Sequence, residues 1–368
     1  MGRLPLTKNV LSFLILFFLI FPGVLHFSPL DGRSIHRLQR TKDVPFIEVF
    51  WKTDDPSRPN KHRFLYHASF ESWAIFGRFN LPNLLKHQLP PIIHYRYEPE
   101  KTVTRERLNR ELNQLVNEVG EEVSRQREIG NFIILKDNDF NFKRHCGILI
   151  AKHKTYPFVV KLFRETPDTL VRPFSKGIIP CLFFDVAGGG SRFFMGGTRI
   201  PNAEAIKARI AQSPYWSNRL TVPRKWFWMP EHGDEMTVVG HRMGPEQTQS
   251  ADYPSVYCIV CDAIKSERTL TIAHSSDRAV ANELTNFIGN RIDPNISNYL
   301  VEEGTGKIAL IDTEHFASIV GLTEELKFKS YGTWYVSLAN HYFEKVIWRN
   351  KQERINDRRK PLPETLRV

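Results

Sequence analysis

Three oxygen-bearing side chains late in the chain have types and spacing suited to metal binding and proton transfer. Asp293 and Asn298 stand five residues apart in a loop that contains proline, and Asp312 follows directly after an apolar run. A carboxylate and an amide oxygen are hard ligands of the kind that Mg²⁺ takes, with phosphates and water completing its octahedron. Asp293 could accept a proton from an attacking hydroxyl. The same residue types are also common in turns, where their side chains make local hydrogen bonds.

A predicted hairpin would bring two of these side chains together. Two strand-like runs, YLV at 299–301 and KIALI at 307–311, lie on either side of the turn at 304–306. A hairpin returns its two ends to one edge of a sheet. Asn298, just before the first strand, and Asp312, just after the second, are therefore expected to lie side by side.

A sheet and a helix are predicted upstream of the hairpin. Pro201 and the alanines after it indicate a helix over 202–212, which carries Glu204. Lys161 stands inside an apolar strand. Short runs rich in β-branched and aromatic residues predict the strands, which are NFIIL, CGILIA, FVVKLF, IIPCLFF, RFFMGG, KWFWM and MTVVGHRM (131–135, 146–151, 158–163, 178–184, 192–197, 225–229 and 236–243).

These segments resemble those of the protein kinase and aminoglycoside phosphotransferase-like superfamily. Asp293-x-x-x-x-Asn298 is similar to the catalytic-loop motif D-x-x-x-x-N. The apolar hairpin that ends in Asp312 resembles the strand pair that ends in the metal-binding Asp of DFG. The strand at 158–163 resembles the VAIK strand, whose Lys pairs with nucleotide phosphates. Residues 236–243 resemble the strand that enters the hinge beside the adenine.

The resemblance implies an α+β, bilobal kinase-like fold. Its β-rich N-lobe would span 130–243, and its small helical C-lobe would span 244–348. It also implies binding of Mg-ATP, with ATP and Mg²⁺ as cofactors, and phosphate transfer to an acceptor or protein partner that the sequence does not identify.

Each candidate residue takes a role from this resemblance. Lys161 would bind the nucleotide phosphates, and Asn298 and Asp312 would hold Mg²⁺. Asp293 would be the catalytic residue that orients or deprotonates the acceptor. Glu204 is the candidate for the helix Glu that pairs with the Lys at the nucleotide site.

Departures from the family pattern leave a second interpretation open. The catalytic loop reads Arg291-Ile292-Asp293, the metal-binding end of the hairpin reads Asp312-Thr313-Glu314, and no G-x-G-x-x-G sequence precedes Lys161. Whether the chain is an enzyme is therefore uncertain. The alternative is a catalytically inactive, pseudokinase-type interaction module tethered to a membrane.

The first 27 residues have the pattern of a membrane-targeting segment. Residues 1–9 form a basic region with Arg3 and Lys8, and residues 10–27 form an apolar stretch of 18 residues. About 20 residues cross a hydrocarbon core of roughly 30 Å, so the stretch is near the minimum length for an anchor. A basic region before an apolar run is also typical of a cleaved secretory signal. A single-pass membrane protein and a secreted protein both remain open.

The flanks of this segment favour one orientation. Two basic residues precede it and four follow it, and the side richer in Lys and Arg tends to stay in the cytoplasm. We therefore expect the C-terminal domain of an anchored chain to be cytoplasmic. The four basic residues are Arg33, Arg37, Arg40 and Lys42.

Composition indicates a folded, basic chain. Hydrophobic residues make up 41% and aromatic residues 12% of the 368 residues, which excludes disordered and collagen-like chains. Lys and Arg exceed Asp and Glu by 11, which favours contact with nucleotide, nucleic acid or an anionic membrane. The C-terminal tail at 349–368 is basic, but no nucleic-acid-binding motif accompanies it, so nucleic acid is not an expected partner. Four Cys exclude a small disulfide scaffold.

Three further segments carry expectations about local structure. Residues 28–129 are expected to be irregular with short elements, apart from an amphipathic helix over about 105–128. Residues 245–253 are expected to form a loop, and the chain beyond them to be helical. In this amphipathic helix, Leu and Val recur at spacings of three and four along one face, which is expected to be buried (Leu108, Leu112, Leu115, Val119 and Val123).

Overall fold

The computed structural model describes most of the chain between residues 46 and 333. The described ranges are 46–55, 62–65, 76–77, 79–121, 127–167, 169–170, 190–243, 246–289, 291–315, 327 and 329–333. The segments predicted at 1–9, 10–27 and 349–368 lie outside these ranges. Of the helices within them, none combines the length and the hydropathy that a bilayer span requires.

The chain has a mixed α+β fold in which nearly all strand pairs are antiparallel, and its largest sheet has seven strands. The strand order is β11-β14-β9-β8-β6-β5, with β7 paired to β8. The strands predicted at 131–135, 146–151, 158–163 and 225–229 are confirmed here. The bounds are β5 Glu128–Ile129, β6 Phe132–Lys136, β7 Phe140–Asn141, β8 Cys146–His153, β9 Phe158–Arg164, β11 Lys225–Trp228 and β14 Val256–Asp262.

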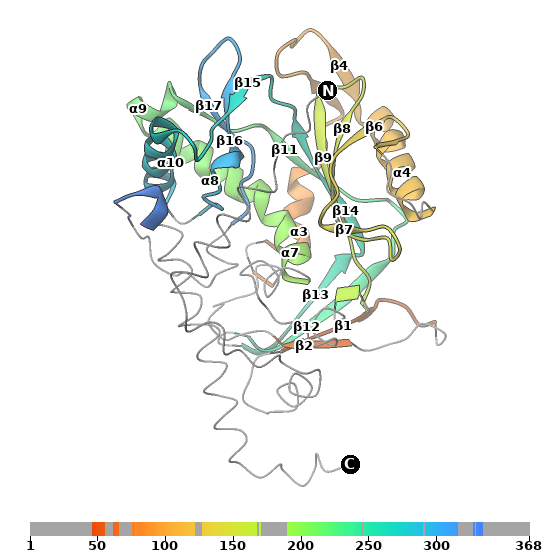
Figure 1. Cartoon of the computed structure of the whole chain (residues 1–368). Helices are drawn as coiled ribbons and strands as arrows, with labels where there is room; N and C mark the ends of the chain where they lie inside the picture. The colour runs from red at the N-terminus through yellow and green to blue at the C-terminus, as the bar shows by residue number, and fades with distance from the viewer. Residues whose placement is uncertain are drawn as a thin grey trace, which may run out of the picture.

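One face of this sheet is covered by helix α4 (Arg105–Glu121), which lies beside it on the right of Figure 1. The helix buries an apolar stripe against strand residues that point to the same face, such as Val160 and Leu162 of β9. This burial confirms the amphipathic helix predicted from about residue 105. The buried residues of α4 are Leu108, Leu112, Leu115, Val116 and Val119.

A second sheet of four strands lies below the first in Figure 1, in the order β13-β12-β1-β2. The strand predicted at 236–243 is confirmed as β12 but belongs to this sheet, and β14 is the strand beside β9. The loop predicted at 245–253 is wrong, because that segment pairs with β12 along its length as β13. The bounds are β1 Phe46–Trp51, β2 His62–Leu65, β12 Glu235–Met243 and β13 Glu246–Pro254.

The position of β14 bears on two further expectations. Residues 256–262 form a buried strand between β9 and β11, so the prediction that the chain is helical directly after residue 253 is wrong. The lobe boundary predicted at 243–244 stays a prediction. The seven-stranded sheet contains strands from both sides of that boundary. Helix α10 (Ser275–Ile288) begins only after β15 (Ser266–Thr269).

A third group of elements packs around helix α8 (Arg199–Ala211). The predicted hairpin forms strands β16 (Tyr299–Glu302) and β17 (Ile308–Leu310), in a four-stranded sheet ordered β10-β17-β16-β15. Ile206 and Ile210 of α8 and Leu284 of α10 share its core. The remaining elements here are β10 Leu220–Thr221 and α9 Pro214–Ser217.

The segment before α8 is helical, although RFFMGG predicts a strand. Residues Gly190–Met195 form the short helix α7, and a 3₁₀ turn at Gly196–Thr198 leads into α8. Phe193 and Phe194 lie buried against the aromatic rings of Tyr253 and Tyr257, so tertiary packing overrides the strand pattern. The strand predicted at 178–184 lies outside the described residues.

Residues 79–104 contain short elements, as predicted. Asn80 caps α3 (Leu81–Leu84), and β3 (Ile92–His94) pairs with β4 (Thr102–Thr104).

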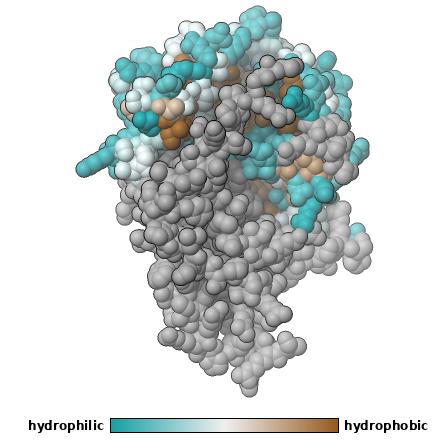
Figure 2. Space-filling model, in the orientation of Figure 1, coloured by the Kyte–Doolittle hydropathy of each residue, from teal (hydrophilic) through white to brown (hydrophobic). Residues whose placement is uncertain are grey.

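Figure 2 shows a largely hydrophilic surface over the described elements at the top of the view, with small hydrophobic areas below it. Only six large hydrophobic side chains in the described ranges are exposed (Leu85, Ile92, Ile133, Leu135, Tyr215 and Ile272).

Candidate functional site

The hairpin places Asn298 and Asp312 at the same end of the β16–β17 strand pair. Tyr299 pairs with Leu310 at this end, and the backbone N–H of Ile311 donates to the backbone carbonyl of Asn298 at 3.0 Å. The turn at the other end contains two glycines with positive φ, which leave the two strands free to reverse tightly. The predicted proximity of Asn298 and Asp312 is therefore confirmed.

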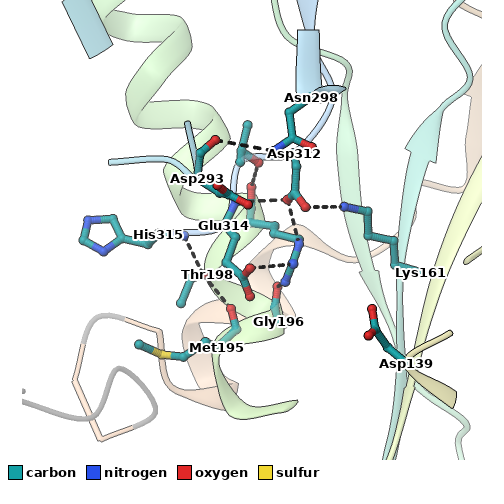
Figure 3. Close-up of polar contacts among 12 residues, drawn as sticks. Asp139, Lys161, Met195, Gly196, Thr198, Asp293, Asn298, Asp312, Glu314 and His315 are labelled. Carbon is teal, nitrogen blue, oxygen red and sulfur yellow. Dashed lines mark hydrogen bonds and ion pairs between the residues drawn. The ribbon is translucent and has the colours of Figure 1, made fainter. Parts of the chain in front are cut away.

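Asp293 lies at the start of a compact loop that leads into the hairpin. Its carboxylate accepts a hydrogen bond from the backbone N–H of Asn295 at 3.0 Å. The side-chain amide of Asn298 donates to the backbone carbonyl of Asp293 at 3.4 Å, the contact drawn in Figure 3. The amide nitrogen of Asn298 is therefore used within the loop, while its oxygen is the atom that a metal ion would bind.

Lys161 reaches the same place from the large sheet. Strand β9 lies between β8 and β14, and the side chain of Lys161 is only 12% exposed. Its Nζ lies 2.8 Å from Oδ2 of Asp312. Figure 3 draws this ion pair as a dashed line. The sheet and the hairpin thus meet at an ion pair between two residues that the sequence identified separately.

Arg199, the first residue of α8, is a member of the site that the sequence analysis missed. Its Nε lies 2.9 Å from Oδ1 of Asp312, and its terminal nitrogen lies 3.0 Å from Oε2 of Glu314. Its guanidinium carbon lies 5.4 Å from the ring centre of Phe163. The two oxygens of Asp312 are therefore divided between two cations, Arg199 on one and Lys161 on the other.

The first turn of α8 is also bonded to the chain that follows the hairpin. Asn202 donates to the backbone carbonyls of Arg291 and Thr313, at 2.7 and 2.9 Å. The Thr313 hydroxyl donates to the carbonyl of Arg199 at 2.6 Å, and the N–H of His315 donates to the Thr198 hydroxyl at 3.1 Å. These bonds hold the loop of Asp293 and the segment after Asp312 against one helix end.

Lys225 is a second buried lysine at the site. It begins β11, and its Nζ donates to the carbonyl of Ile311 at 2.7 Å, one residue before Asp312. Burial lowers the pKa of Lys225 to about 8, because the charged ammonium loses its contact with water. In its protonated form, Lys225 adds positive charge beside Asp312.

The surrounding cations keep Asp312 ionised. Burial alone would raise the pKa of this carboxyl, but Arg199 and Lys161 outweigh that effect and hold the pKa well below its usual range. Burial opposes the charge of Arg199 as well, but Asp312 and Glu314 raise its pKa above the ordinary value. With Lys225 protonated, the cluster of Lys161, Arg199, Lys225, Asp312 and Glu314 holds three cations and two carboxylates, an excess that favours binding of an anion.

Glu204 is not part of this cluster. Its carboxylate lies 2.8 Å from Nζ of Lys207 on the same helix, and its side chain is 51% exposed. The carboxylate beside Lys161 belongs to Asp312. The prediction that Glu204 pairs with Lys161 is therefore wrong in this structure, because Glu204 faces solvent while the start of α8 presents Arg199 to the site.

A chain of hydrogen bonds and one ion pair thus joins four of the five predicted residues. Asp293 bonds to Asn298, Asn298 bonds to the residue before Asp312, and Asp312 pairs with Lys161. Arg199, Lys225 and Glu314 complete the site without a spacing pattern that could have marked them. The adjacent proline-led helix was the one signal near Arg199, and it identified the helix rather than the side chain.

The oxygen-bearing side chains of the site are of the types that Mg²⁺ takes together with phosphates. Within the described ranges, no three side chains of His, Cys, Asp or Glu form a group that could hold a metal ion. Mg²⁺ usually keeps several waters and takes one or two carboxylates plus substrate phosphates, so it does not need such a group. Asp312 and the amide oxygen of Asn298 match that requirement. Comparison of the chain with protein-family models and with curated proteins found no match.

Proposed function

We propose that the chain binds Mg-ATP at this site and transfers phosphate to an acceptor that the site does not identify, as a divergent bilobal kinase-like protein. The observation that carries the proposal is the Lys161–Asp312 ion pair, joined to Asn298 through the backbone of the hairpin. Two motifs that lie about 150 residues apart in the sequence are thereby in contact, in the combination that phosphoryl transfer requires.

The proposal gives each residue a role. Lys161 binds nucleotide phosphates with its ammonium, and the excess positive charge of the cluster draws the phosphates toward it. Asn298 and Asp312 would hold Mg²⁺, which neutralises charge on the phosphates when bound. Asp293 orients or deprotonates the acceptor hydroxyl from the half-buried loop before the hairpin.

The face of the sheet that carries Lys161 suits a nucleobase. Ile150 of β8 is the cross-strand partner of Lys161, so both side chains stand on this face. Val159, two residues before Lys161, and Ile148, two residues before Ile150, share it. All three apolar side chains are only partly buried. An aromatic base bound there would cover apolar surface while its phosphates reach Lys161.

We also propose that residues 10–27 tether this domain to a membrane as a single-pass anchor, with the C-terminal domain in the cytoplasm, where nucleotide is present. The alternative is secretion after cleavage of the same segment as a signal. The expectation of a cytoplasmic domain depends on the basic residues after the segment.

One observation favours the pseudokinase-type alternative. Both oxygens of Asp312 contact cations, so the carboxylate that would hold the metal ion is already paired within the protein. A chain that never exchanged these contacts for a metal ion would act as a binding module of the same fold. The two functions differ in the fate of ATP, because an active enzyme releases or transfers the terminal phosphate of ATP and a binding module does not. In an active enzyme, Asp293→Asn should abolish this reaction while ATP binding persists.

Thermal unfolding of the full-length chain tests nucleotide binding. We expect Mg-ATP to raise the unfolding temperature, because a ligand at one hundred times its Kd adds about 2.7 kcal/mol to the free energy of unfolding. Lys161→Met should unfold cooperatively but lose most of this gain at the same ATP concentration. Removing the ammonium leaves Asp312 with Arg199, so the fold should persist.

Lys154→Met is the matched control, because Lys154 is an exposed lysine in the same sheet region that pairs with Glu128. We expect its response to Mg-ATP to equal that of the wild type. An unfolding temperature of the wild type that does not change up to millimolar ATP would refute the proposed function.

A further inference from the structure

We propose that Arg199 is the positioning residue that keeps Asp312 oriented toward the metal ion when Lys161 leaves it for the nucleotide phosphates. This inference rests on the proposed function. It concerns a residue for which the kinase resemblance gives no role, and it divides the two cations of Asp312 into a resident one and a mobile one.

The contacts of Arg199 identify it as the resident cation. Arg199 as a whole residue is only 2% exposed. The guanidinium contacts Asp312 and Glu314 at 2.9 and 3.0 Å, and it reaches the backbone carbonyl of Gly196 at 3.4 Å. A planar guanidinium donates to several acceptors in fixed directions, so it fixes the orientation of a carboxylate as well as its charge.

Lys161 has the properties of the mobile cation. Its ammonium sits at the end of a flexible four-carbon stem and contacts Asp312 only through Oδ2, at 2.8 Å. Its side chain is more exposed than that of Arg199, at 12% against 3%. When Lys161 turns to bind nucleotide phosphates, Oδ2 of Asp312 becomes available to a metal ion. Oδ1 stays paired with Arg199.

The anchoring of α8 explains why Arg199 can keep this role. The start of the helix is bonded to Arg291 and Thr313 through Asn202, and to His315 through Thr198. In the kinases that the chain resembles, the helix supplies a Glu to the strand Lys. Here the helix supplies an Arg to the carboxylate, so it supports the metal-binding side of the site instead of the phosphate-binding Lys.

The test is the dependence of ATP affinity on Mg²⁺, measured by calorimetry on the full-length chain with either excess Mg²⁺ or EDTA. In Arg199→Lys, the affinity in EDTA should stay within about threefold of the wild type, while the gain in affinity from Mg²⁺ falls about 10-fold or more, as expected for loss of a group that orients a metal ligand. Lys161→Met should weaken binding in both conditions.

Glu314→Gln is the second variant, because it weakens the hold on Arg199 without altering Asp312, and it should reduce the gain from Mg²⁺ by a smaller factor. If the role of Arg199 were merely structural, its substitution would instead lower the unfolding temperature and weaken ATP binding equally in both conditions. That result, or an unchanged gain from Mg²⁺ in both variants, would overturn the inference while the proposed function stands. A wild type that binds no ATP in either condition would overturn both.

Discussion

Asp312→Asn is expected to lower the free energy of unfolding by about 3 kcal/mol, the lower end of the range for removing one partner of a buried ion pair. Lys161 and Arg199 each contact one oxygen of the carboxylate, and both are largely buried. Asparagine keeps the shape of the side chain but removes its charge. The asparagine NH₂ group would also point at Lys161 or Arg199, whose side chains are donors and cannot accept a hydrogen bond.

Urea unfolding measures this loss, with Asp293→Asn as the matched control. The carboxylate of Asp293 accepts a hydrogen bond from the N–H of Asn295, which an asparagine oxygen can also accept. We expect the control to stay within about 0.5 kcal/mol of the wild type. If Asp312→Asn were as stable as this control, the carboxylate would not be the centre of the charge cluster.

This expectation affects how the function should be tested. Loss of ATP binding in Asp312→Asn would not separate a missing metal ligand from a destabilised site. Lys161→Met and Asn298→Ala are cleaner probes, because neither leaves a buried charge without a partner of opposite sign.

Gly196→Ala is expected to destabilise the chain by about 3 kcal/mol, the upper end of the usual cost of overpacking a core. A Cβ atom at Gly196 would lie 2.1 Å from the Tyr257 hydroxyl oxygen and 2.7 Å from the Phe163 ring. These two rings are stacked with centres 4.7 Å apart and are completely buried. The Tyr257 hydroxyl also donates to the carbonyl of Phe193, so neither ring can move aside at low cost.

Because Gly196 leads into α8, the same substitution should displace Arg199 and weaken Mg-dependent ATP binding. Gly77→Ala is the matched control, since a Cβ there meets no atom within 4 Å. We expect it to unfold within about 0.5 kcal/mol of the wild type. Equal stability of the two variants in urea would show that the backbone before α8 can shift without loss, contrary to the packing described here.

Local patterns predicted the elements whose side chains decide their own structure. The Leu and Val stripe of α4 and the alternating apolar residues of β9 each have one buried face that fixes the element. The hairpin at Asn298 and Asp312 was predictable because a glycine-rich turn separates two short apolar runs.

Contacts with other elements decided the structure of the segments that the sequence could not predict. The polar segment at 246–254 is a strand because β12 offers it a partner along its whole length. The aromatic pair at 193–194 is helical because Phe193 packs on Tyr257 and Tyr253. Arg199 and Lys225 meet Asp312 only after two sheets and α8 assemble, and no spacing in the sequence encodes that meeting.

The central claim is that Lys161, Asn298 and Asp312 form a nucleotide site, and calorimetric titration of ATP into the full-length chain tests it most directly. We predict saturable binding of one ATP per chain that is stronger with Mg²⁺ than with EDTA. Lys161→Met should weaken it about 10- to 100-fold, the value of a charge-assisted hydrogen bond. Asn298→Ala should remove most of the gain from Mg²⁺. No binding at millimolar ATP, in a chain that unfolds cooperatively, would contradict the account.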